Sequence, residues 1–131
     1  MNRRKIDIRS QRGQSLTEFA LALPVLALLL FAVIQFGLVF NNYVTLTDAT
    51  RAGARKGAVG RQLPNPQAAT VTAVRASAAD LKQSDLSVTV ASSFLSGTDV
   101  TVTATYPYRI SLLGMVVKSG RLSSSTTERV E

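Results

Sequence analysis

The sequence predicts an α+β protein in which a long N-terminal transmembrane and stem helix precedes a small head. Two observations support this: an uncharged apolar run lies near the N-terminus, and the C-terminal half combines one helical pattern with alternating strand patterns. We expect three parts: a basic leader over 1–13, a transmembrane and stem helix over 14–60, and a head over 61–131. In the head, one helix is expected to pack on about three antiparallel strands.

The expected anchor runs from Phe19 to Phe40, 22 residues in which Gln35 is the one strongly polar side chain. At ~1.5 Å per residue a helix of this length spans roughly 33 Å, enough for the hydrocarbon core of a bilayer. The rest of the chain is too short to wrap a helix that is apolar on every face. The run also exceeds the ~7–15 residues of a signal-peptide core and lacks a clear cleavage site after it. We therefore expect a retained anchor.

The positive charge of the chain is concentrated at its start. The formal net charge is +7, and residues 1–13 hold five cations against Asp7, which leaves only +3 for the remainder. This distribution indicates a leader rather than a basic domain, so no nucleic-acid partner is expected. Cations on both sides of the span weaken the positive-inside bias, but those of the leader lie closer to the membrane and favour a cytoplasmic N-terminus. They are Arg3, Arg4, Lys5, Arg9 and Arg12 before the span, and Arg51, Arg55, Lys56 and Arg61 after it.

Composition argues against catalysis. The chain has no cysteine and no histidine, which excludes disulfides, thiol chemistry, the usual zinc sites and the usual general base. The acids of the head show no spacing that predicts a catalytic dyad, and no glycine-rich phosphate loop is present. We expect no enzyme, no metal and no cofactor.

The junction between leader and anchor carries the most specific signal. Ser15-x-x-Glu18 matches a capping box, in which the two side chains satisfy free N–H groups at a helix start. Glu18 would also face the positive end of the helix dipole. A cap does not explain why Gly13 stands between a basic leader and the helix.

A basic leader, Gly13, four residues, Glu18-Phe19 and a long apolar helix together resemble the signal of a type IV-type prepilin. The resemblance implies that a membrane-embedded prepilin peptidase cuts between Gly13 and Gln14 on the cytoplasmic side. It also implies that Glu18 pairs with the new N-terminal ammonium of a neighbouring subunit. A carboxylate at the edge of hydrocarbon is costly unless it is paired, so its desolvation would be offset only on assembly.

Residues 12–60, with Pro24 in the first turns and DATRAGARKGAV at 48–59, resemble the TadE-like family, small pilin-like proteins of tight-adherence (Tad) pilus systems. The resemblance implies a minor pilin or pseudopilin, because the major pilins of these systems look much shorter. It implies a single-pass protein of the bacterial inner membrane with a periplasmic head, which either stays in the membrane or enters the pilus. The implied partners are the prepilin peptidase, other pilin and minor pilin subunits, and the assembly platform of a pilus used in adhesion.

Two features of the long helix have mechanical interpretations. Pro24 cannot donate to the carbonyl of Ala20, so we expect a bend there, either harmless or a soft point that helps the helix leave the bilayer. Ala49, Gly53 and Gly57 recur every four residues on one face, which permits close approach of another element. We favour packing of this face against the head over direct contact with another subunit.

Arg51 and Arg55 share another face of the same helix, and Asp48 lies one turn before Arg51. The spacing predicts an ion pair between Asp48 and Arg51. The two arginines are also candidates for contact with anionic lipid head groups or with a partner.

The head is expected to begin with an amphipathic helix over 66–83, since its apolar positions recur at spacings of three and four. Alternating residues predict strands over 86–91 and 100–106, joined as a hairpin. Tyr106-Pro107-Tyr108 should break the second strand or place it at an edge. The apolar segment 112–117 is expected to be a connecting turn, on the sheet or near the membrane, and 121–130 a weak third strand.

Two other functions remain open at this point. An uncleaved, signal-anchored periplasmic adaptor would keep its full length and bind an envelope partner through its head. A secreted binding module with a long cleaved signal would be soluble.

Overall fold

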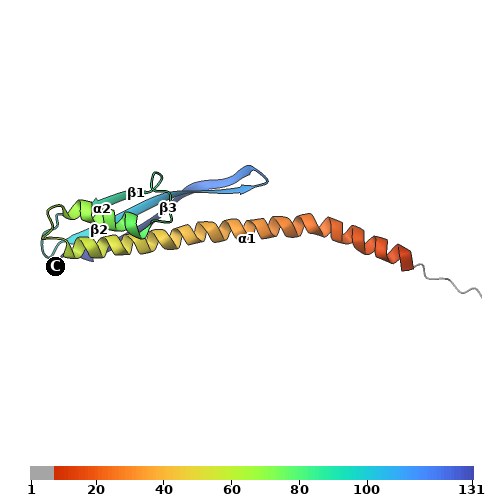
Figure 1. The fold of residues 1–131 in the computed structure, drawn as a ribbon, viewed down its shortest axis with the longest axis horizontal. Helices are drawn as coiled ribbons and strands as arrows, with labels where there is room; N and C mark the ends of the chain where they lie inside the picture. The colour runs from red at the N-terminus through yellow and green to blue at the C-terminus, as the bar shows by residue number, and fades with distance from the viewer. Residues whose placement is uncertain (1–7) are drawn as a thin grey trace, which may run out of the picture.

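The computed structural model describes residues 8–131, with side chains from Gly13 onward. Over these residues it contains a long helix, a short helix and a three-stranded sheet. In chain order the elements are α1 (Ile8–Val59), α2 (Pro66–Ser77), β1 (Ser87–Ala91), β2 (Asp99–Leu112) and β3 (Met115–Arg129). Figure 1 shows α2 and the sheet beside the C-terminal part of α1, while its N-terminal part extends away from them. The predicted α+β class with a small head is confirmed.

The sheet has the order β1-β2-β3, and both neighbouring pairs are antiparallel. Val88 lies opposite Ala104 and Val90 opposite Val102, so β1 and β2 form the predicted hairpin. Successive side chains of a strand point to opposite faces. In β2 the side chains of Val100, Val102 and Ala104 are fully buried, whereas the threonines between them are only partly buried. One face of the sheet therefore belongs to the core.

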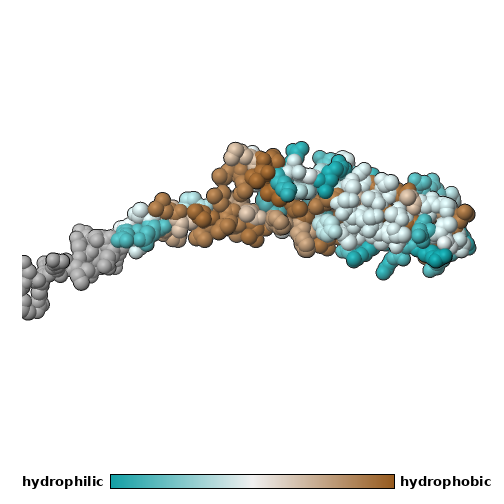
Figure 2. All heavy atoms as spheres, turned by 180° about the vertical axis from the view of Figure 1, so that it is seen from behind, coloured by the Kyte–Doolittle hydropathy of each residue, from teal (hydrophilic) through white to brown (hydrophobic). Residues whose placement is uncertain are grey.

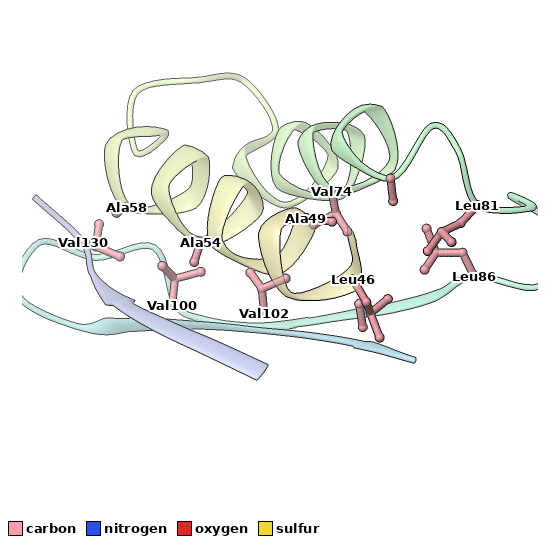
Figure 3. Close-up of a cluster of buried hydrophobic side chains, with 12 residues drawn as sticks. Leu46, Ala49, Ala54, Ala58, Val74, Leu81, Leu86, Val100, Val102 and Val130 are labelled. Carbon is pink, nitrogen blue, oxygen red and sulfur yellow. The ribbon is translucent and has the colours of Figure 1, made fainter. Parts of the chain in front are cut away.

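The core lies between this face of the sheet and the two helices (Figure 3). Apolar side chains of the C-terminal part of α1 meet those of β2 there, so α1 supplies part of the core of the head. The division expected at residue 60 marks the end of α1 but does not separate two cores. The buried apolar residues are Leu46, Ala49, Ala54, Ala58, Val74, Ala78, Leu81, Leu86, Val100, Val102, Ala104 and Val130.

The opposite face of the sheet carries hydroxyl side chains that pair across the strands. The Oγ1 atoms of Thr101 and Thr127 lie 2.9 Å apart, and Thr103 Oγ1 lies 2.9 Å from Ser125 Oγ. Such pairs stabilise neighbouring strands without needing burial. This face is the solvated side of a two-layer head.

Helix α2 is shorter than the predicted range 66–83 and ends at Ser77. Asn65 caps its start, with its side-chain oxygen 2.9 Å from a backbone N–H of the first turn. At the other end Gln83 Nε2 donates to the carbonyl oxygen of Ala78 at 2.8 Å. A side chain that satisfies this terminal carbonyl lets the chain leave the helix early, which helical periodicity alone does not reveal.

Strand β2 continues through Pro107, so a break at this residue is wrong. Strand β1 begins at Ser87, opposite Thr105, and β2 therefore has a free edge beside Pro107, where a missing N–H is tolerated. The partner β3 is correspondingly longer than the predicted range 121–130. Both strands are longer than predicted because the β2–β3 ladder also pairs positions at which apolar and polar residues alternate only weakly.

The predicted connecting segment 112–117 forms the tip of the β2–β3 hairpin. Leu113 and Gly114 have φ angles of 51° and 82°, the left-handed pair that a tight type I′ turn requires. Glycine adopts this region readily, whereas Leu113 does so against its steric preference. Figure 1 shows the hairpin running beyond the rest of the sheet and alongside α1.

Candidate functional site

The leader junction lies inside α1 rather than at its start. Helix α1 begins at Ile8, so Ser15 and Glu18 stand more than one turn inside it, and a capping box at a helix start is wrong for the intact chain. Gly13 is helical, and a Cβ added to it would meet no atom within 4 Å. Residues 1–7 of the expected leader lie outside the described residues. The peptide bond after Gly13 is thus exposed on one face of a continuous helix.

Glu18 and its neighbours form a small polar cluster on the surface of α1. Gln14 Nε2 donates to Glu18 Oε1 at 3.1 Å, and Thr17 Oγ1 donates to the carbonyl oxygen of Gly13 at 3.0 Å. Phe19, directly after the carboxylate, is 60% exposed. Among the residues whose side chains the structure describes, no cation forms an ion pair with Glu18. The carboxylate is therefore accessible to a cation from outside the chain.

The head does not bury the apolar anchor that follows. The segment Gly13–Val59 of α1 is long and apolar enough to cross a membrane, and none of its most apolar 18-residue window is buried. Figure 2 shows the continuous apolar surface along this part of the helix. Water is a poor environment for such a surface, whereas a bilayer or other apolar helices match it.

Pro24 lies inside α1, six residues after Glu18. The axis of α1 changes direction within the orange part of the helix in Figure 1, the part that contains residue 24. A proline removes one hydrogen bond of the helix and clashes with the preceding turn, which accounts for a bend at this place.

The small residues of the stem face the head. Ala49 is fully buried, and a Cβ added to Gly53 would lie 2.3 Å from Val74 Cγ2 of α2. At Gly57 an added Cβ would lie 2.9 Å from Val100 Cγ2 of β2. Real Cβ atoms do not approach so closely, so only glycine allows the backbone of α1 to come this near to α2 and β2.

The arginines of the stem lie on the exposed side of α1. Arg51 Nη1 is 3.6 Å from Asp48 Oδ1, with both side chains more than half exposed. Arg55 lines an open hollow together with Glu128 and Glu131. At ~1.5 Å per residue the two arginines stand roughly 16 and 22 Å beyond Phe40 along the helix axis. The interfacial layer of a bilayer is only ~5–8 Å thick, so both arginines stand beyond this layer when the span ends at Phe40.

The described residues hold no group of three or more side chains suited to binding a metal ion. The described part of the chain presents a helical junction at Gly13, one exposed carboxylate, an exposed apolar helix and a head packed on the end of that helix.

The comparison with protein families bears on the same segment as these features. The TadE-like family model matches residues 13–55. The resemblance seen in the sequence is thereby confirmed for this segment, which indicates a protein associated with Tad pili. No curated protein and no solved structure matches the chain.

The TadE-like segment covers the junction, the apolar anchor and most of the stem, and it stops before α2. It therefore includes Glu18, Pro24 and Gly53, while Gly57 and the whole sheet lie beyond it. The sheet and α2 complete the core that the stem begins, but nothing in the comparisons describes them.

Sequence reasoning expected the apolar segment 112–117 to be a connecting turn, on the sheet or near the membrane, and did not count it among the site residues. The structure makes it the exposed tip of the β2–β3 hairpin. Leu112 and Leu113 line a hollow together with Phe31 and Gln35 of the anchor. The signal available in the sequence was an apolar run followed at once by Lys118, in a stretch without acids. The tip lies beside the anchor because the β2–β3 ladder that carries it is long, and the apolar run does not reveal this length.

Proposed function

We propose that the protein is a prepilin-like minor pilin or pseudopilin, anchored in the inner membrane, that supports initiation or assembly of a Tad-type pilus used in adhesion. One observation carries the proposal. The junction from Gly13 to Glu18 runs without interruption into an apolar helix that the head leaves exposed. Such a helix needs apolar surroundings, which a bilayer supplies before assembly and neighbouring pilin helices supply after it.

The leader is removed between Gly13 and Gln14, on the cytoplasmic side, and the head faces the periplasm. Because α1 is helical at Gly13, the peptidase must first unwind this turn, and glycine is among the residues that stabilise a helix least. After the cut the helix begins beside Gln14. Ser15 and Glu18 then lie in its first turn, where a hydroxyl and a carboxylate are favourable.

Glu18 is the assembly carboxylate. Its contact with Gln14 is exposed and holds it only weakly, so it can exchange this partner for the N-terminal ammonium of a neighbouring subunit. In an apolar filament interior that ion pair would be desolvated, and either charge alone would be strongly unfavourable there. The bend near Pro24 fits a helix that must pass from the bilayer to the filament. During this transfer the stem face formed by Ala49, Gly53 and Gly57 keeps the head attached to α1.

Cleavage is tested by N-terminal sequencing of the protein from cells with and without the cognate prepilin peptidase. The expected mature chain begins at Gln14 only when the peptidase is present. Gly13→Phe should block the cut, and because a Cβ at this position meets no other atom within 4 Å, the fold should tolerate the change. Gly37→Phe is the matched control, since Gly37 also has open space, and it should be cut normally. A chain that still begins at Met1 beside active peptidase rules the prepilin function out.

The role of the carboxylate is tested by Glu18→Ala. We expect normal cleavage and a large loss of pili on the cell surface, counted by electron microscopy. Gln14→Ala removes the same hydrogen bond but leaves the charge, and should retain piliation. Normal piliation with Glu18→Ala would contradict the assembly role while leaving the cleavage result unaffected.

A second candidate function is an uncleaved, membrane-anchored adaptor whose head binds an envelope partner. The unbroken course of α1 through Gly13 favours it, because an anchor that is never cut has no need for the helix to unwind there. It predicts full-length protein in every strain and no dependence on the peptidase, so the same sequencing experiment separates the two functions.

A further inference from the structure

The tip of the β2–β3 hairpin exposes a compact group of large apolar side chains. Leu113 is 80% exposed, Met115 70%, Val116 58% and Val117 62%. Side chains of this type exposed together at the end of a projecting hairpin are costly in water. They lie beyond the core of the head, so folding of the chain does not bury them.

The tip stands beside the middle of the apolar anchor. Leu112, Leu113 and Gly114 share a hollow with Leu28 and Phe31 of α1. In Figure 2 the apolar surface of the projecting hairpin is continuous with that of the helix. At ~1.5 Å per residue, Phe31 lies roughly 14 Å inside the span that ends at Phe40. A bilayer that surrounds the anchor must therefore also surround the tip.

A polar band follows the tip at the level where the anchor ends. Lys118 and Arg121 share a second hollow with Tyr43 and Tyr108, beside the last apolar turns of α1. A third cation, Arg109, lies on the hairpin too and lines a different hollow with Asp85. Cations and tyrosines just outside an apolar segment are typical of residues at the membrane interface.

In the part of the chain that the structure describes, no carboxylate lines the hollow that holds Lys118 and Arg121. The hairpin has no acidic residue between Asp99 and Glu128, and α1 has no charged residue from Phe19 to Thr47. Among the described residues, none of the hairpin cations forms an ion pair. The anchor of a second copy would offer the tip an apolar surface but no acid at the height of the cations. A lipid bilayer offers both an apolar surface and negatively charged groups, since the acyl chains lie directly below the phosphates.

We propose that the hairpin tip, residues 112–117, is a second membrane contact that inserts into the leaflet on the head side, with Lys118 and Arg121 at the lipid phosphates. The contact rests on the single-pass anchoring proposed above but not on leader cleavage or pilus assembly. It fixes the head against the membrane surface by two points, α1 and the hairpin. The β2–β3 ladder closes at Leu112 and Met115, which pairs the backbone groups that face the partner strand, while the outer edges of this short end of the hairpin stay unpaired.

The chain contains no tryptophan, so one introduced tryptophan reports on one place. The full-length variant Leu113→Trp is reconstituted in phosphatidylcholine and phosphatidylglycerol vesicles, with and without lipids brominated on the acyl chains. We expect emission shifted to the blue and strong quenching by the brominated lipids. The matched control is Leu95→Trp, a leucine that is 64% exposed in the loop at the opposite end of the sheet. It should show neither effect.

Neutralising Lys118 and Arg121 tests whether these side chains interact with the lipid phosphates. In the Leu113→Trp background, Lys118→Gln and Arg121→Gln should each lower the ratio of molecules with the tip inserted to molecules with the tip withdrawn roughly fivefold. The reason is that a cation near an anionic membrane surface contributes ~1 kcal/mol to binding. The loss should vanish in vesicles of phosphatidylcholine alone.

Three results would overturn the inference. Equal, weak quenching of the two tryptophans would place the tip in water. A blue shift without quenching by brominated acyl chains, together with disulfide-linked dimers of Val116→Cys, would assign the tip to a second copy. Protein released from the vesicles by alkaline washing would refute the single-pass anchoring itself, and this outcome separates failure of the anchor from failure of the tip.

Discussion

The two ends of α1 belong to one helix but meet the rest of the molecule in opposite ways. In the anchor, Leu30 is 61% exposed, and large apolar side chains cover every face. In the stem, Leu46 is fully buried, and the residues that follow on the same face are small, alanine and glycine together with Thr50. The same type of side chain is thus left bare in one half and buried in the other.

The difference shows how a single helix serves two environments. Small residues let the backbones of α2 and β2 come close, so the stem becomes part of a folded core. Large residues keep other backbones away and present a surface that only lipid or other helices match. Stability of the head should therefore depend on the stem and not on the anchor. Four substitutions test this, each measured as the free energy of unfolding of the head in detergent, by urea titration followed by near-ultraviolet circular dichroism.

The largest effect is expected from Leu46→Ala. Removing a fully buried leucine leaves a cavity and should cost about 2–5 kcal/mol of the free energy of unfolding. The matched control is Leu30→Ala in the anchor, which should leave the stability of the head unchanged. Equal losses from both variants would mean that anchor and stem form one cooperative unit, and the contrast between them would fail.

Gly53→Ala should come next. The new methyl group would overlap Val74 on α2, and overpacking of this kind costs about 1–3 kcal/mol. In Gly37→Ala the same change meets open space and should leave the head at least as stable as before. If Gly53→Ala stabilised the head, the close approach of α1 and α2 would be refuted.

A smaller loss is expected from Thr50→Val, because Thr50 is a buried polar residue of the stem. Its hydroxyl lies 2.8 Å from the Thr47 carbonyl and 3.0 Å from Thr126 Oγ1, and losing these contacts should cost about 1–2 kcal/mol. Thr103→Val, on the solvated face of the sheet, should change stability by less than ~0.5 kcal/mol. The reverse order of the two losses would contradict the layer arrangement.

The smallest effect should follow Asp48→Asn. The pair with Arg51 joins two largely exposed side chains within one helix, so its loss should cost less than ~0.5 kcal/mol. Adding salt should erase even that difference, because exposed ion pairs are screened. A larger, salt-resistant loss would show that this side of the stem has a structural role in the head.

Much of the fold was predictable because it depends on local patterns. The apolar run before Asn41, the alternation in 100–106 and the helical spacing that places Val74 on the buried face of α2 each need only neighbouring residues. The end of α2 was not predictable in this way, because Gln83 reaches back to cap it. Nor was the passage of β2 through Pro107, which depends on where its partner β1 begins.

The sequence by itself determined that the chain has an apolar anchor and a small α+β head, since composition and periodicity carry these properties. The likeness of the junction at Gly13 to a prepilin signal rests on a resemblance in a short motif. The tertiary structure alone decided that Gly53 and Gly57 accommodate α2 and β2, and that the hairpin tip stands beside Phe31. Both depend on residues distant in sequence meeting in space. Such contacts are set by backbone geometry and strand length, which local patterns do not encode.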